Sequence, residues 1–212
     1  MIKKVQAASG AIFAAFVAIH LFNTALAAFG LTAYDTFQEA VRGIYQAFVI
    51  EVLLLSALMV HVVCGVVRMI KERGRPLNTR AKWHRYSGIF LLLFVGGHIM
   101  AVRGPSWFYG IYPGFEGLAF SIDFAPYYFF PYYFLLGVAG FYHALNGLSI
   151  GLPRLNLRMR IENPMLLRAT AASAMVMLAA LLGLAGVWTD VGAPYESEFA
   201  KLALEIWNGL ST

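Results

Sequence analysis

Histidines are the residues of this chain whose positions best suit chemistry. His20, His61, His98 and His143 each stand within a different long apolar segment. Ionisable side chains are rare inside such segments, because hydrocarbon does not solvate charge, and they are therefore candidates for function. An imidazole in this setting can relay a proton, bind a metal ion or hold a haem iron.

The four histidines fall at two depths within their segments. A helix rises about 1.5 Å per residue, so His61 and His143 lie ~10–12 Å from the basic end of their segments. On the same scale, His20 and His98 lie ~20–24 Å from that end. We therefore expect an inner layer and an outer layer, each with one histidine from each of two helices.

Small residues recur at fixed distances from these histidines. A serine–glycine pair begins eleven residues before each outer histidine, and a glycine follows each inner histidine by four residues. The small residues are Ser9, Gly10, Ser87, Gly88, Gly65 and Gly147. Eleven residues are almost three helical turns, so each serine shares a face with its outer histidine but lies at the inner depth. We expect these residues to make room for a large flat group, although small residues also pack membrane helices together.

A flat macrocycle held between two histidines accounts for both the layers and the small residues. We therefore predict two haems b, one with iron ligands His61 and His143 and one with His20 and His98. Zinc or copper would favour clustered ligands at one depth, with acids or cysteines nearby. The chain has one cysteine and no C-x-x-C-H motif for covalent haem attachment. A proton relay is the alternative, although it leaves the small residues unexplained.

Two further basic side chains stand toward the basic ends of the apolar segments, beyond the inner layer. Arg68 follows His61 by two turns on the same face, so it is a candidate partner of a haem propionate. The alternative is the ordinary snorkelling of a basic residue at a helix end. His84, within Lys-Trp-His-Arg, has no counterpart at its depth. We expect it to be an interfacial residue that meets a partner subunit or a propionate.

Composition sets the fold class. Apolar residues make up 60% of the chain and charged residues 13%, and the mean hydropathy is +0.68. These values exclude a disordered chain, a nucleic-acid-binding domain and a soluble fold of this size. Five apolar segments, at about residues 5–29, 45–70, 86–102, 127–150 and 164–188, are long enough to cross a bilayer as helices. We therefore predict an all-α membrane protein, with one integral membrane domain over residues 1–212. The first segment is too long for the core of a signal peptide, so we expect it to be retained.

Charge predicts the orientation of these helices. Basic residues gather before the first segment and in the connections after the second and fourth, whereas most acids lie in the other connections. The positive-inside rule therefore predicts a cytoplasmic N-terminus and a periplasmic C-terminus. Aromatic residues crowd residues 107–134, on the predicted outer side. We interpret them as an interfacial belt, with the lining of an entry for a hydrophobic ligand as the alternative.

These residues resemble the five-helix, single-polypeptide, dihaem cytochrome b subunit of succinate:quinone oxidoreductases and quinol:fumarate reductases. The resemblance covers about residues 5–190, and its motifs are Ser9-Gly10 with His20, His61 with Gly65, Ser87-Gly88 with His98, and the run from His143 through Gly147 to Arg154. It implies a proximal haem, near the cytoplasm, on His61 and His143. It implies a distal haem on His20 and His98.

The resemblance also implies partners and a location. A flavoprotein with FAD and an iron–sulfur subunit would sit on the cytoplasmic face of a bacterial inner membrane, anchored by this multi-pass chain, and two such heterotrimers could pair. Two haems stacked across the membrane suit menaquinol as electron donor and fumarate reduction as the outcome. Succinate oxidation with quinone reduction is the alternative. Further alternatives are the dihaem anchors of hydrogenases, formate dehydrogenases and nitrate reductases, whose ligands are distributed differently over the helices, and a non-haem transporter.

Two carboxylates are candidate proton acceptors. Quinol oxidation releases two protons, so an acid near the outer layer would serve as acceptor. Glu39 lies in a short amphipathic stretch where the resemblance implies an acidic residue, and we rank it first. Glu51, on an otherwise apolar stretch ten residues before His61, ranks second. The alternatives are a solvated loop acid for Glu39 and a paired acid for Glu51. Phe141 departs from the resemblance, because some dihaem members carry there a glutamate associated with transmembrane proton movement, and that route does not carry over.

Overall fold

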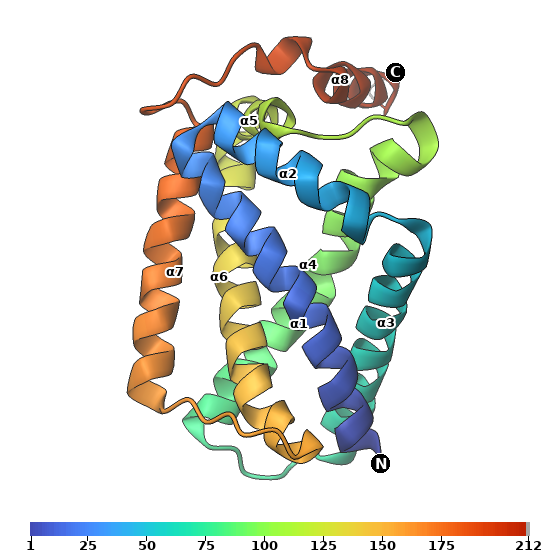
Figure 1. Ribbon diagram of the computed structural model, residues 1–212, viewed down its shortest axis with the longest axis vertical. Coiled ribbons are helices and arrows are strands. Elements are labelled where there is room, and N and C mark those ends of the chain that lie inside the picture. The colour runs from blue at the N-terminus through green and yellow to red at the C-terminus, as the bar shows by residue number, and fades with distance from the viewer. Residues whose placement is uncertain (211–212) are drawn as a thin grey trace. The chain divides into compact units, whose positions relative to one another are not determined.

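The computed structural model describes residues 1–210, and these residues form helices and connections with no strand (Figure 1). Five helical segments are long and apolar enough to cross a membrane, which confirms the predicted number of spans. They are Ile2–Phe29 (α1 Ile2–Leu26 with the short helix η1 Ala27–Phe29), Phe48–Lys71 (α3), Thr79–Tyr109 (α4), Pro126–Leu155 (α6 Pro126–Gly151 with η2 Leu152–Leu155) and Asn163–Leu184 (α7).

Large apolar side chains stay exposed along these helices. Met59, Leu93 and Met175 each leave well over half of their surface uncovered. Water would penalise such a surface, whereas lipid tails would not. The chain therefore has the outer surface of a multi-pass membrane protein.

Two spans have boundaries that differ from those the sequence predicts, one at its start and one at its end. The third was expected over 86–102, but α4 begins at Thr79 because the side-chain oxygen of Asn78 accepts a hydrogen bond from the backbone N–H of Ala81, at 2.8 Å. Arginine and lysine are good helix formers, so the basic stretch before residue 86 continues the helix. The fifth was expected to reach residue 188. α7 stops at Leu184, where Gly186, with φ of +74°, turns the chain.

Three shorter α-helices and one further 3₁₀ helix connect or follow the spans. They are α2 (Leu31–Tyr45), α5 (Phe115–Phe124), η3 (Pro194–Glu196) and α8 (Glu198–Leu210). α2 and α8 are amphipathic, with one apolar and one polar face. The aromatic-rich residues 107–134, read from the sequence as an external connection, are thus largely helical.

Backbone contacts divide the chain into two compact units. Unit 1 consists of Met1–Leu21, Val41–Leu92 and Gly137–Ser173. Unit 2 consists of Phe22–Ala40, Leu93–Leu136 and the residues from Ala174 onward. α1, α2, α4, α6 and α7 each contribute residues to both units. The single integral domain over residues 1–212 stays a prediction.

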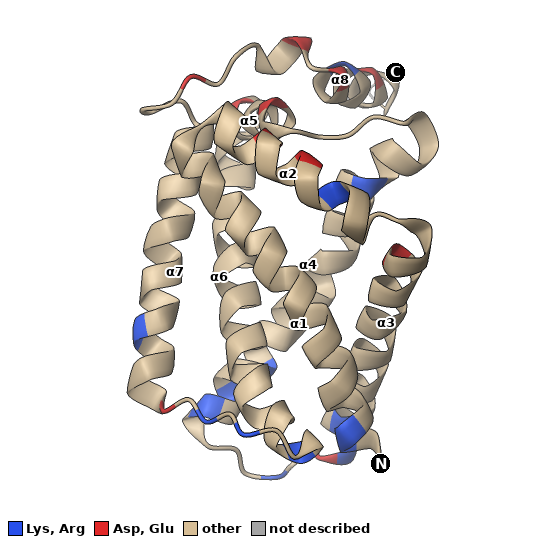
Figure 2. Cartoon of the chain, viewed as in Figure 1, with Lys and Arg blue, Asp and Glu red and all other residues tan. Residues whose placement is uncertain are grey.

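The charges divide along the same lines. Unit 1 holds every lysine and arginine except Arg103 and Lys201, and unit 2 holds every acid except Glu51, Glu72 and Glu162. In unit 1 the basic residues stand at helix ends and in the connections between them (Figure 2). The charge asymmetry behind the predicted orientation is therefore also an asymmetry between the two units.

Unit 2 has a small apolar core made by the connecting helices α2 and α5 together with the ends of two spans. Phe115 is fully buried there against residues that include Tyr34 from α2 and Leu181 from α7. A carboxylate oxygen of Asp35 accepts a hydrogen bond from the backbone N–H of Phe115, at 3.0 Å, and so satisfies a free donor at the start of α5. The indole of Trp188 donates to the carbonyl oxygen of Ala28, at 2.9 Å. The first of these bonds joins α5 to α2, and the second joins the residues after α7 to the end of the first span.

Candidate functional site

The two inner histidines meet in unit 1. The ring centroids of His61, on α3, and His143, on α6, lie 6.1 Å apart, and their planes are 89° to one another. A bond from imidazole nitrogen to metal is about 2 Å, so two imidazoles on opposite sides of one metal ion have centroids roughly 6 Å apart. At this spacing, His61 and His143 could hold one iron between them.

Each of these histidines has one ring nitrogen held by a backbone carbonyl. His61 Nδ1 lies 3.0 Å from the carbonyl oxygen of Gln6, and His143 Nδ1 lies 3.2 Å from that of His84. A carbonyl only accepts, so Nδ1 carries the proton and Nε2 keeps its lone pair. Metal-binding histidines are generally oriented in this way, by a bond from the nitrogen that does not bind the metal.

Glycines stand directly against both rings. A Cβ atom at Gly10 would lie 2.6 Å from His61 Nδ1, and one at Gly88 would lie 2.9 Å from His143 Cε1. The histidine ring itself thus fills the space that each serine–glycine pair leaves. The other two glycines face side chains: a Cβ at Gly65 would lie 3.3 Å from the amide nitrogen of Gln6.

The sequence repeat is also a repeat of contacts. Gln6 stands four residues before Gly10, as His84 stands four residues before Gly88. Each provides the carbonyl for the histidine of the neighbouring helix. Each also covers the glycine four residues after that histidine, since a Cβ at Gly147 would lie 3.3 Å from His84 Cε1. His84, for which the sequence suggested no counterpart, therefore corresponds to Gln6.

The paired serines complete this correspondence. Ser9 is buried, and its hydroxyl donates to the carbonyl oxygens of Val5 and Gln6, at 2.9 and 3.3 Å. The hydroxyl of Ser87 donates to the carbonyl oxygen of His84 at 3.0 Å and lies 3.2 Å from His143 Nδ1. Both serines therefore support the carbonyl that orients an inner histidine.

His84 itself lies within α4 rather than in a connection. Its ring is stacked on that of His143, with centroids 4.1 Å apart and planes 7° apart. Its Nδ1 atom is buried and has no hydrogen-bond partner among the described residues. His84 thus adds a third imidazole to the inner pair, as a neighbour of His143.

The outer histidines fall in different units, and each has aromatic neighbours. In unit 1, the ring of His20 stacks on that of Phe16, one turn earlier in α1, with centroids 5.8 Å apart. In unit 2, His98 lies 6.5 Å from the ring of Tyr132 on α6, which also contacts Phe94. The pairing of His20 with His98 stays a prediction.

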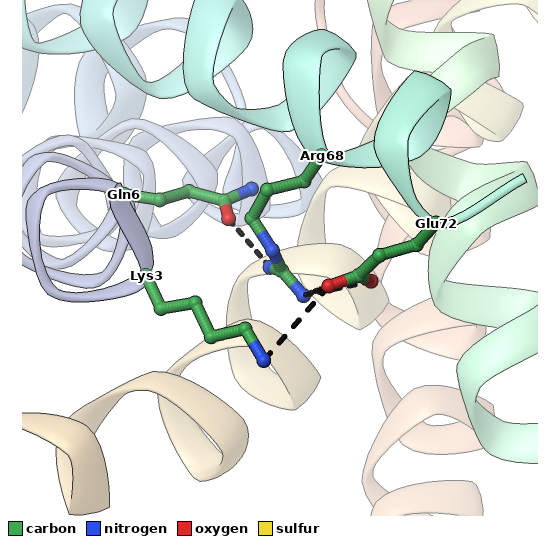
Figure 3. Close-up of polar contacts among 4 residues, drawn as sticks. All are labelled: Lys3, Gln6, Arg68 and Glu72. Atoms are coloured by element: carbon green, nitrogen blue, oxygen red, sulfur yellow. Dashed lines mark hydrogen bonds and ion pairs between the residues drawn. The ribbon is translucent and has the colours of Figure 1, made fainter. Parts of the chain in front are cut away.

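Arg68 has protein partners that the sequence did not suggest (Figure 3). Its guanidinium donates to the side-chain oxygen of Gln6 at 2.6 Å and pairs with Glu72 at 3.2 Å, and Glu72 also lies 3.9 Å from the ammonium of Lys3. Arg68 thereby steadies the residue whose carbonyl orients His61. Pairing of Arg68 with a propionate stays a prediction.

The two candidate acids lie in different surroundings. Glu39 is exposed on α2, in unit 2. Glu51 is half-buried in the first turn of α3, in unit 1. The N-terminal end of a helix favours a negative charge, so the position of Glu51 also has a structural explanation.

Arg80 and Asn146 form a polar network that sequence reasoning missed. The Arg80 guanidinium donates to the side-chain oxygen of Asn146 and to the carbonyl oxygen of Ile161, both at 2.6 Å. Asn146 is completely buried, and an asparagine in an apolar segment was the available signal. A cavity of about 680 Å³ lies beside this network, lined by residues that include Arg80, Arg160 and Asn163.

Among residues 1–210, no three or more His, Cys, Asp or Glu side chains lie together in a group that could hold a metal ion. A haem iron needs only two axial ligands from the protein, because the macrocycle provides the others.

Comparison of the chain with protein-family models, with curated proteins and with solved structures finds no match.

Proposed function

We propose that this chain is a dihaem cytochrome b, the membrane anchor of a quinol:fumarate reductase. The observation that carries the proposal is the His61–His143 pair, with rings 6.1 Å apart and each Nδ1 held by a carbonyl. When bound, two haems b would transfer single electrons between a quinol and a soluble partner. His61 and His143 would hold the proximal haem, and His20 and His98 the distal one.

The protein's own contribution is to prepare the inner ligands. The carbonyls of Gln6 and His84 keep the Nε2 lone pair of each ring available and limit its rotation. The glycines at 10 and 88 let the rings lie against the neighbouring helices. A site arranged in advance in this way loses less freedom when the ligand binds.

Charge supports the orientation and the partners. The basic side chains of unit 1 other than Arg42, which the predicted orientation places outside, favour a cytoplasmic position for the helix ends that carry them. They would offer a docking surface to the iron–sulfur and flavoprotein subunits. The quinol, for which menaquinol is our first choice, would react near the distal haem, with Glu39 or Glu51 as proton acceptor. The same chain in a succinate dehydrogenase would run the electrons in the opposite direction.

A visible spectrum tests the proposal directly. The protein is purified from membranes in mild detergent, reduced with dithionite and assayed for haem per chain. We expect the α-band of a b-type cytochrome and two haems per chain. A colourless protein would contradict the proposal and favour a non-haem transporter.

Identification of the chains that co-purify separates the possible complexes. A flavoprotein with FAD and an iron–sulfur protein would support the reductase assignment. Partners with a molybdenum or nickel–iron centre would instead indicate the anchor of another respiratory enzyme.

A further inference from the structure

We propose that His84 is a positioning residue that fixes the ring plane of His143 by stacking on it. This inference rests on the proposed function, in which His143 is an axial ligand of the proximal haem. The two rings are nearly parallel, at 7°, and their centroids are 4.1 Å apart. A ring packed face to face with a neighbour cannot turn about its Cβ–Cγ bond without losing that contact.

The internal repeat isolates the contribution of the His84 side chain. Gln6 and His84 occupy corresponding positions and make the same two contacts, a carbonyl to the inner histidine and a side chain over a glycine. Only His84 adds a ring that stacks on the ligand. The chain therefore orients His61 by a hydrogen bond and His143 by a hydrogen bond together with a stacked ring.

The glycine at 147 makes this stack possible. A Cβ atom at Gly147 would lie 3.3 Å from His84 Cε1, closer than ordinary van der Waals contact, so a larger residue would displace the ring. Gly147 thus leaves the space in which the His84 ring stacks on one face of the His143 ring.

The consequence is a defined angle between the two inner ligands. The planes of His61 and His143 are 89° apart, close to the perpendicular limit. In a low-spin ferric haem with two imidazole ligands, the anisotropy of the EPR signal is greatest when the ligand planes are perpendicular. Any rotation of His143 away from this position would therefore reduce the anisotropy, which makes EPR a direct readout of the stack.

The main test is His84→Gln, which places at 84 the side chain already found at 6. The backbone carbonyl is kept, so both haems should remain bound. We expect the highly anisotropic low-spin signal of one haem to become less anisotropic or broader, while the signal of the other haem stays unchanged. Gly147→Ala should shift the same signal in the same direction, because the added methyl group displaces the His84 ring while residue 84 remains a histidine.

Gly140→Ala is the matched control, because a Cβ at 140, on the same helix as Gly147, would have no atom within 4 Å. It should leave both EPR signals unchanged. If the wild-type protein holds two haems and both signals persist unaltered in His84→Gln and Gly147→Ala, the positioning role is wrong while the proposed function stands. If the wild-type protein holds no haem, both proposals fail.

Discussion

Gly10 lies so close to His61 that a Cβ atom at position 10 would stand 2.6 Å from Nδ1 of the imidazole. The same nitrogen lies 3.0 Å from the carbonyl oxygen of Gln6, on the helix that carries Gly10. α1 therefore both approaches the ring and orients it, and the close approach depends on the absence of a side chain.

Gly10→Ala should disturb this arrangement. The added methyl group must displace the His61 ring or separate α1 from α3, and overpacking of this kind typically costs about 1–3 kcal/mol. We expect haem content to fall from two toward one per chain, measured on protein that elutes as a single species. Gly140→Ala has open space around it and should keep two haems. An unchanged haem content in Gly10→Ala would show that the ring position does not matter for binding.

Substitution of the four histidines should divide them into two pairs. His61→Ala or His143→Ala should remove one haem, and His20→Ala or His98→Ala the other, because a haem that loses an axial ligand binds weakly and changes spin state. Haem per chain and the redox titration of the remaining haem are measured for each variant. The two members of a pair should leave the same haem behind. A variant that keeps two low-spin haems would remove that histidine from the ligand set.

Glu39→Gln should slow quinol oxidation without changing haem content. General-base catalysis typically contributes 10²–10⁴-fold, so we expect turnover with a menaquinol analogue to fall by roughly 100-fold. Glu39 is exposed on α2, so we expect the substitution to leave the fold unchanged. If turnover is unchanged with both haems present, Glu39 is not the acceptor, and Glu51→Gln becomes the variant to measure.

Asp35→Ala should destabilise unit 2. The carboxylate accepts the backbone N–H of Phe115 at the start of α5, and loss of such a cap typically costs about 1 kcal/mol. The expected result is a lower midpoint of thermal unfolding in detergent, followed by tryptophan fluorescence. Asp35→Asn keeps an acceptor oxygen and should lose less stability. Equal losses in the two variants would mean that the charge of Asp35, rather than the hydrogen bond, is what stabilises α5.

The membrane-spanning helices could be predicted from the sequence because their cause is local. A long apolar segment in lipid must satisfy its own backbone groups, and a helix is the only way in which a single segment does so. The ends were harder to predict. α4 continues through Lys82 and Arg85, since helix formation there depends on the cap at Asn78 and not on hydropathy.

The connecting helices were not predicted apart from the amphipathic stretch around Glu39. α5 is apolar and short, and its burial against α2 and α7 depends on contacts between residues far apart in the chain. The same is true of the Arg80–Asn146 bond, which joins residues 66 positions apart. No periodicity within one segment reports such contacts.

From the sequence alone the depth of each histidine could be predicted, because every helix rises by about the same amount per residue, and with it which histidines would share a layer. Only the tertiary structure decided what faces each ring. The carbonyls of Gln6 and His84 reach His61 and His143 because of how far neighbouring helices are rotated and how closely they approach. Rotation and approach are set by the packing of many side chains on several helices at once, and spacing along one helix does not encode them.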